Sequence, residues 1–305
     1  MFLGLPAPER GFTMDVLKAI IMGVIQGLTE FLPVSSSGHL GLIKGLTGME
    51  TGDSILFDIL LHFATLVAIV AVFYKDIIML VVEFFGMCRD IIFNIAAFGK
   101  SLSGNKDIAY TRVINSTYRK FVLLLIVSTI PTGIIGVLMK DVVERTSGNL
   151  LVTGICLVCT GLILALSDFL SEGDKKLKDM DNADAFAIGT AQGIATLPGL
   201  SRSGTTIVAG MLCGLDRKFA ARYSFIMSIP AVLGAFVLEL FDIGKESVTA
   251  GDVGCYVLGM VIAAVLGFFA LKFLLNIVVN RYFKYFAYYC GLVGIVSIIV
   301  YFARK

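Results

Sequence analysis

The side chains best suited to chemistry in this chain lie in two similar segments. Residues 26–39 read QGLTEFLPVSSSGH, and residues 192–205 read QGIATLPGLSRSGT. The matching positions share one offset, because 192−26, 201−35, 203−37 and 204−38 all equal 166. Each segment is interrupted at a proline, continues as a turn rich in serine and glycine, and becomes apolar again. Such paired interruptions in a hydrophobic chain predict a central binding site.

Both turns have the composition of an anion-binding site. Pro33 and Pro198 each remove a backbone donor and disfavour helix in the residue before them, so a new helix should begin after each turn. Two helix N-termini facing one cavity would attract a doubly or triply charged group, such as phosphate or pyrophosphate. Arg202 adds a planar guanidinium that suits bidentate phosphate contacts. The residues predicted to bind this anion are Arg202, Ser35, Ser37, Ser201, Ser203 and Thr206.

Glu30 is the only carboxylate in either segment, and it follows Gln26 by four residues. This spacing places both side chains on one face of a helix. A carboxylate and an amide oxygen on one face can share a divalent cation, and such hard ligands suit Mg²⁺ or Ca²⁺. We therefore predict Glu30 and Gln26 as metal ligands. The alternative is that Glu30 is a polar residue at a helix end near the membrane interface.

His39 follows the serine run, and a histidine near a hydroxyl offers a general base or acid close to neutral pH. Together with Glu30, Ser36 and Arg202 it makes the predicted catalytic set. His62 lies in the next apolar stretch, and its position there favours a packing or hydrogen-bonding role over catalysis.

The composition indicates an all-α polytopic membrane protein. Hydrophobic residues make up 57% of the chain and charged residues 16%, with a mean hydropathy of +0.89. Spanning a bilayer takes about 20 mostly apolar residues in a helix. About six transmembrane helices are expected, in addition to two broken re-entrant segments. These spans are predicted at Ser54–Tyr74, Phe121–Met139, Thr146–Ser167, Ala220–Leu238, Val253–Leu271 and Tyr285–Ala303.

The order of these elements predicts a single membrane domain over residues 1–305, built as an internal repeat. The first half is expected at 15–167, a charged linker at 168–184 and the second half at 185–305. Three predicted spans separate the two broken segments, which indicates an inverted-topology repeat whose copies meet near the membrane midplane. The more charged stretch 76–98 is predicted as an interfacial or amphipathic helix.

The charge distribution says little about partners or orientation. A net charge of +2 gives no reason to expect nucleic acid. Basic residues between positions 75 and 120 favour a cytoplasmic placement of that region, but the linker 168–184 also carries three lysines. Charge along the sequence therefore leaves the orientation open.

The motifs at 30–39 and 198–206 closely resemble the two signatures of the undecaprenyl-diphosphate phosphatase family, the bacitracin-resistance type. The resemblance extends over essentially the whole chain in length, span order and motif position. It implies a multi-pass enzyme of the bacterial plasma (inner) membrane that removes one phosphate from undecaprenyl diphosphate. That reaction recycles the lipid carrier for cell-wall synthesis and confers bacitracin resistance. The resemblance also implies a divalent cation, usually Mg²⁺, and an active site on the extracytoplasmic side.

Carried over by position, the family pattern assigns the hydroxyl-turn serine to Ser36, the histidine to His39 and the anion-binding arginine to Arg202. Ser36 would attack the terminal phosphorus or position a water, and His39 would move the proton. The acidic motif falls on Gln26 and Glu30, and Gln26 departs from the glutamate that many members carry. One carboxylate must then serve metal binding or base chemistry with less help.

A different class of function, a secondary transporter or polyprenyl-phosphate flippase, is also consistent with inverted repeats and broken helices. The set of Glu30, Ser36, His39 and Arg202 exceeds what anion binding alone requires, which favours an enzyme. The expected partners are a polyprenyl diphosphate substrate and membrane lipids, without nucleic acid. A homodimer is a further candidate assembly.

Overall fold

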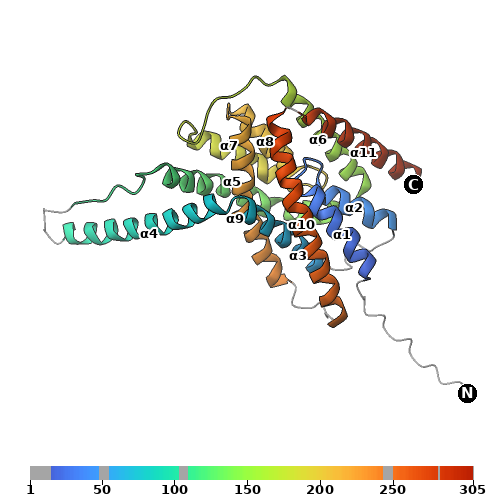
Figure 1. Cartoon of the computed structure of the whole chain (residues 1–305), viewed down its shortest axis with the longest axis horizontal. Coiled ribbons are helices and arrows are strands. Elements are labelled where there is room, and N and C mark those ends of the chain that lie inside the picture. Colours follow the sequence, from blue (N-terminus) through green and yellow to red (C-terminus); the bar gives the residue numbers. More distant parts are fainter. Residues whose placement is uncertain (1–14, 48–54, 103–108, 243–249, 281, 305) are drawn as a thin grey trace, which may run out of the picture.

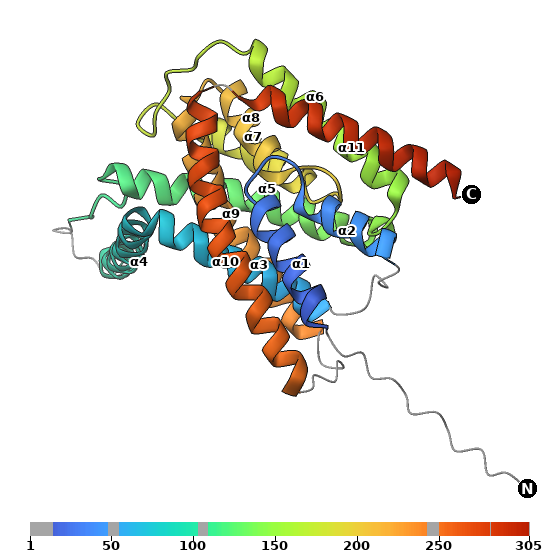
Figure 2. The ribbon, with the colours of Figure 1, turned by 45° about the vertical axis from the view of Figure 1, so that its right-hand side comes forward.

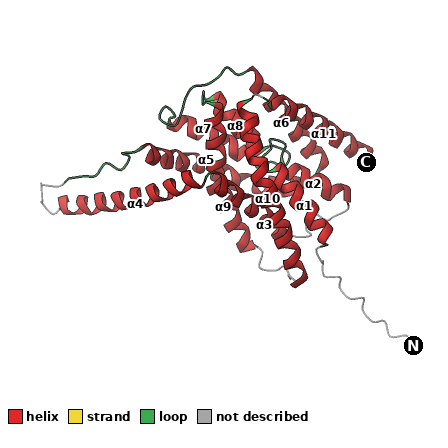
Figure 3. Ribbon diagram, in the orientation of Figure 1, coloured by secondary structure: helices red, strands yellow, loops and turns green. Residues whose placement is uncertain are grey.

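The computed structural model describes residues 15–47, 55–102, 109–242, 250–280 and 282–304. Within these ranges it consists of helices joined by turns and loops, with no strand (Figures 1 and 3). The helices are α1 (Val16–Thr29), α2 (Ser36–Thr47), α3 (Ile55–Val72), α4 (Tyr74–Leu102), α5 (Thr117–Thr146), α6 (Leu150–Phe169), α7 (Asn182–Ile194), α8 (Arg202–Leu212), α9 (Arg217–Asp242), α10 (Ala250–Val279) and α11 (Phe283–Ala303). The all-α class is confirmed.

Five of the six expected spans correspond to long apolar helices, and the sixth, Ser54–Tyr74, corresponds to α3. Among the described residues, α5, α6, α9, α10 and α11 are long and apolar enough to cross a membrane, and a sixth span results if α3 and α4 count as one bent span. The predicted start of the span Thr146–Ser167 was wrong. Thr146 ends α5, and the next helix starts at Leu150, because the Asn149 side chain accepts the backbone N–H groups of Leu151 and Val152 and caps it.

Both predicted interruptions are present as helix–turn–helix units. α1 and α2 flank the first turn, and α7 and α8 flank the second. The four helices have 11 to 14 residues each, too short to span a bilayer singly. α7 begins at Asn182, three residues before the predicted second half, because Asp181 and Asp184 form a capping box there.

The two predicted halves interlock instead of packing as separate bodies. α1 packs along α10, α5 along α7, and α6 along α11, so each broken segment rests on a long helix of the other half (Figure 2). The boundaries 15–167 and 185–305 thus describe a repeat in the sequence. That the two halves are structural units stays a prediction. The contacts place both turns inside the bundle.

α4 departs from the other helices in direction. It is bent by 92° from α3, and with residues 109–116, which lead into α5, it forms an arm at the edge of the molecule (Figure 1). Arg119 at the start of α5 is buried and donates to Glu83 (2.8 Å) and Asp90 (2.6 Å) of α4. Glu83 and Asp90, two charged residues of the predicted interfacial stretch 76–98, thus connect α4 to α5.

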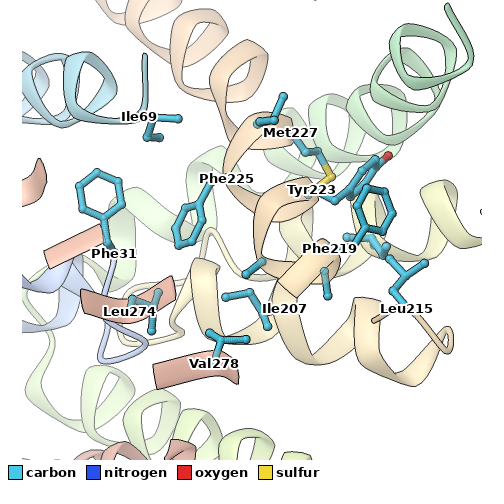
Figure 4. Close-up of a cluster of buried hydrophobic side chains, with 14 of the residues drawn as sticks. Phe31, Ile69, Ile207, Leu215, Phe219, Tyr223, Phe225, Met227, Leu274 and Val278 are labelled. Carbon is cyan, nitrogen blue, oxygen red and sulfur yellow. The ribbon is translucent and has the colours of Figure 1, made fainter. Parts of the chain in front are cut away.

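The main hydrophobic core lies beside the turns and holds them in place. Phe31, in the first turn, is fully buried and packs edge-to-face on Phe225 of α9, with ring centroids 5.8 Å apart (Figure 4). Ile207 of α8 lies in the same cluster, between the residues of α9 and those of α10. Burying aromatic rings and branched side chains at this point stabilises the turn positions.

Candidate active site

The two serine-rich turns lie against each other. A Cβ atom on Gly38 would come 3.1 Å from the Cα of Gly199, and one on Gly204 would come 3.1 Å from the Cβ of Pro33. Each turn therefore uses a glycine where the opposite turn approaches most closely. As a result, the N-termini of α2 and α8 sit side by side, and both contribute to one cavity, as the 166-residue offset predicted.

The two turns are also built alike. The hydroxyl of Ser35 accepts the N–H of Gly38 (3.2 Å), and that of Ser201 accepts the N–H of Gly204 (3.1 Å). These are N-cap hydrogen bonds, and they leave the other N–H groups of each first turn available to an anion. Ser35 has a positive φ of 69°, a backbone conformation uncommon for residues other than glycine. Such local strain is often found at functional sites.

Glu30 is the hub of the site. Its carboxylate is buried and accepts hydrogen bonds from Ser36 Oγ (2.6 Å), from Gln26 Nε2 (3.0 Å) and from the guanidinium of Arg202. The pairing joins residues 172 positions apart and connects the first turn to the second. Ser36 and Arg202, each the first residue of its helix, therefore face the same carboxylate.

A cavity of about 350 Å³ opens beside this cluster. Its lining is mostly polar where the two turns contribute and apolar where α9 contributes, and we call these the polar side and the apolar side. Such a lining suits a ligand with a charged head and a hydrocarbon tail. The polar side is lined by Thr29, Glu30, Ser35, Ser36, Ser37, His62, Thr132, Gln192, Thr196, Ser201 and Arg202. The apolar lining residues on α9, which form the apolar side, are Ala231, Val232, Ala235 and Phe236, and the others are Ile59, Val143, Ala195 and Leu200.

Two polar atoms of cavity-lining residues are buried without a hydrogen-bond partner. They are Nη1 of Arg202, a donor, and Oε1 of Gln192, an acceptor. Buried polar groups are normally paired, so these two atoms are candidates for contacts with a bound ligand. The free arm of the guanidinium can donate to an anion while its other arm holds Glu30.

The predicted anion-binding residues divide into two groups. Ser35, Ser37, Ser201 and Arg202 line the cavity. Ser203 and Thr206 do not, because they are buried in α8: the Ser203 hydroxyl pairs with Ser201 (3.3 Å), and Thr206 donates to the carbonyl of Arg202 (2.8 Å). These two side chains stabilise the second turn through hydrogen bonds with Ser201 and Arg202.

His39 lies near Ser36 in sequence but does not line the cavity. Its Nδ1 is 2.8 Å from the Ser35 carbonyl oxygen, and its Nε2 is 2.7 Å from the hydroxyl of Tyr289 on α11. Both ring nitrogens are engaged there, so proton transfer by His39 stays a prediction.

His62 makes a hydrogen bond, as one of the two roles expected for it required, and it also lines the cavity. Its Nδ1 is 2.9 Å from the Asp58 carbonyl, and its Nε2 is 3.8 Å from Glu30 Oε2. The signal available in the sequence was the rarity of an ionisable residue within an apolar span.

The candidate metal ligands remain a hypothesis. Among the described residues, no group of three or more His, Cys, Asp or Glu side chains is arranged to hold a metal ion. Glu30 offers one anionic group, and Gln26 has an unpartnered, buried Oε1 beside it. Mg²⁺ commonly takes one or two carboxylates and completes its shell with water and substrate phosphates, so this donor set fits a cation that arrives with a diphosphate.

Comparison with known proteins connects this site to one family. The family model of the bacitracin resistance protein BacA matches residues 19–296. The chain belongs to this family. It is 40% identical over 265 residues to an undecaprenyl-diphosphatase from Methanosphaera stadtmanae, covering 87% of this chain and 90% of that protein. Relatives with the same name from Halothermothrix orenii and Methanobrevibacter smithii are each 41% identical, covering 87% and 88% of this chain and 90% and 91% of theirs.

Proposed function

We propose that this BacA-family protein is an undecaprenyl-diphosphatase, which converts undecaprenyl diphosphate to undecaprenyl phosphate and inorganic phosphate. The observation that carries the proposal is the buried Glu30 carboxylate, which holds a serine and an arginine at two adjoining helix N-termini. This arrangement combines a nucleophile, a base and an anion site in one cavity with an apolar side. The names of the relatives supply the substrate.

The diphosphate head would occupy the polar side of the cavity. The free Nη1 of Arg202 and the N–H groups at the start of α2 and α8 would donate to its oxygens. Negative charge grows on the oxygen that bridges the two phosphorus atoms as the bond to it breaks, and pre-positioned donors stabilise that charge. A divalent cation held by Glu30 and Gln26 would add charge neutralisation when bound.

Ser36 would act as the nucleophile and Glu30 as its base. The Ser36 hydroxyl donates to Glu30 Oε2, so the proton passes to the carboxylate as Ser36 Oγ bonds to the terminal phosphorus. The bond from that phosphorus to the bridging oxygen breaks, and undecaprenyl phosphate leaves with the bonding electrons. Water then attacks the phosphoserine and its hydroxyl bonds to the phosphorus, while Glu30 returns its proton to the serine oxygen. Inorganic phosphate leaves, the remaining proton of the water goes to solvent, and the serine hydroxyl and the Glu30 carboxylate are both restored.

Arg202→Lys tests the anion site. We expect phosphate release to fall by about 10²–10³-fold, because an ammonium is a point charge and cannot reproduce the planar bidentate fork of the guanidinium. The measurement is kcat/KM for undecaprenyl diphosphate in detergent. A variant within a few-fold of wild type would show that position 202 supplies only local charge.

The polyprenyl tail would follow the apolar side of the cavity along α9. Ala231, Val232, Ala235 and Phe236 form one wall there, and Ala235 is exposed on the surface of the bundle. Ala235→Phe should therefore raise KM for undecaprenyl diphosphate about 10-fold, equivalent to ~1.4 kcal/mol, by filling the path of the tail.

The matched control is Val237→Phe, on the same turn of helix but outside the cavity lining and 49% exposed. Its KM should stay within about twofold of wild type. Equal KM values for the two variants would place the tail elsewhere.

The folded structure supports an extracytoplasmic active site. α5 and α9 begin side by side, with the Phe121 and Tyr223 rings stacked 5.8 Å apart. Two contacts hold other segments at this end. Lys120 of α5 donates to the carbonyl of Lys178 in the linker (2.7 Å), and Arg222 of α9 forms a salt bridge with Asp76 at the start of α4. The basic residues gathered there are Lys75, Arg119, Lys120, Lys175, Lys176, Lys178, Arg217, Lys218 and Arg222. By the positive-inside rule this end faces the cytoplasm.

The cavity lies toward the opposite ends of α5 and α9, since Val143 and Phe236 line it. A cysteine at Lys140 should thus react with a membrane-impermeant maleimide in intact cells, with wild type as the blank. A cysteine at Lys178 should react only after the cells are opened. The reverse pattern would contradict this orientation, in which the active site of a plasma-membrane protein faces the periplasm or the cell exterior.

A homodimer stays a prediction, tested by the mass of the protein in detergent.

The alternative function, a transporter or flippase, is distinguished by a reaction without compartments. Purified protein in detergent micelles should release inorganic phosphate from undecaprenyl diphosphate. Transport cannot produce that signal, so an inactive, folded preparation supplied with Mg²⁺ would favour the alternative.

A further inference from the structure

We infer that Tyr289 of α11 is a positioning residue for the reaction and that it acts through His39. The inference rests on the proposed function, because it assigns the pair to the turn that carries the nucleophile. The His39 ring is stacked on Tyr289, with centroids 5.6 Å apart and planes 7° apart, and the two side chains are hydrogen-bonded. They join parts of the chain that are 250 residues apart.

The hydrogen bonds fix the state of the His39 ring. A carbonyl oxygen can only accept, so the hydrogen of the ring lies on Nδ1 and is donated to Ser35 O. Nε2 of the neutral ring is then an acceptor, and the Tyr289 hydroxyl donates to it. The lone pair that a general base would use is therefore occupied by Tyr289, on the side of the ring away from the turn.

The accepting carbonyl belongs to the strained residue of the turn. Ser35 has a φ of 69°, and its carbonyl receives both the backbone N–H of His39 (3.2 Å) and the Nδ1–H of the ring. That carbonyl belongs to the peptide bond that leads into Ser36. Holding its direction fixes where α2 begins and where the Ser36 hydroxyl points.

A neighbouring contact shows that α11 supports the same turn independently. The thiol of Cys290, the next residue, is fully buried and donates to the Pro33 carbonyl (3.5 Å). α11 thus touches the turn on both sides of its strained residue. Tyr289 contacts the turn through the His39 ring and does not line the cavity, so its loss should change the chemical step without changing substrate binding.

The experiment compares three single variants in the full-length protein in detergent, with undecaprenyl diphosphate as the probe. Tyr289→Phe keeps the ring stack and removes the hydroxyl, and we expect kcat to fall about fivefold to tenfold with KM within about twofold. Tyr288→Phe, at the adjacent position, which is 73% exposed, is the control and should match wild type. His39→Asn retains an amide N–H that can reach the Ser35 carbonyl, so it should keep well over ten times the activity of His39→Ala.

A double variant separates positioning through His39 from a general structural effect. In the His39→Asn background, Tyr289→Phe should cause no further loss of kcat, because asparagine has no ring nitrogen to accept a hydrogen bond from the Tyr289 hydroxyl. A full and additive loss there would overturn the inference, as would wild-type kcat in Tyr289→Phe. Equal activities of His39→Asn and His39→Ala would show that His39 transfers the proton itself. Failure of the wild type to release phosphate would instead count against the proposed function.

Discussion

Replacing Glu30 by glutamine is expected to lower kcat for phosphate release by roughly 10²–10⁴-fold. The amide keeps the size and the accepting oxygen of the carboxylate, but it cannot take the proton of Ser36 or hold Arg202 as an ion pair. It would also remove the only carboxylate proposed to bind a cation. The measurement is phosphate release from undecaprenyl diphosphate over a range of Mg²⁺ concentrations.

The control for this variant is a measurement of folding. Removing one partner of a buried ion pair leaves the other uncompensated, which commonly costs about 3–5 kcal/mol, so thermal unfolding must be followed alongside activity.

Gln192→Glu, made in the Glu30→Gln protein, is the matched variant for activity. It adds a carboxylate at the position that the repeat relates to Gln26, and it should not restore phosphate release. Near-normal turnover of folded Glu30→Gln would remove Glu30 from both roles.

Replacing Ser36 by alanine should have the largest effect, a loss of at least roughly 10⁴-fold in kcat. The hydroxyl lies at the first residue of α2 and donates to Glu30 at 2.6 Å, so its removal deletes the nucleophile while Arg202 and the helix N-termini remain. Binding of the substrate should therefore persist, measured by inhibition of wild-type turnover or by direct titration of the inactive variant.

The competing mechanism predicts a much smaller loss. If water attacks the phosphorus, Ser36→Ala removes one hydrogen bond, worth about 1 kcal/mol or roughly fivefold in rate. Ser37→Ala is the matched control, since Ser37 lines the same cavity without contacting Glu30. Comparable activities of the two alanine variants would favour attack by water.

The sequence alone was sufficient to predict the fold class and the position of both turns. Hydropathy located the spans, because bilayer thickness sets a minimum length for an apolar helix. The common offset of 166 identified Ser35 and Ser201 as equivalent, and the structure gives them equivalent N-cap hydrogen bonds. The bend of 92° between α3 and α4 was not predicted, because the sequence at 72–74, VFY, contains neither a proline nor a glycine to mark it.

Residue roles that depend on side-chain direction were harder to predict. Spacing in the sequence places His39 beside Ser36, yet its ring turns toward Tyr289, a partner from a helix near the end of the chain. His62 comes within 3.8 Å of Glu30 because α3 packs against α1, which only the packed structure shows. The contact of Glu30 with Arg202 likewise joins two motifs that the sequence could only suggest were near each other.

The most direct test of the account is to trap phosphate on the enzyme. Purified protein would be mixed with undecaprenyl diphosphate labelled in its terminal phosphate, quenched within a single turnover and digested for mass spectrometry. The account predicts label on Ser36, in step with the formation of undecaprenyl phosphate, and none in Ser36→Ala. Rapid phosphate release without label on Ser36, and with activity retained in Ser36→Ala, would contradict it.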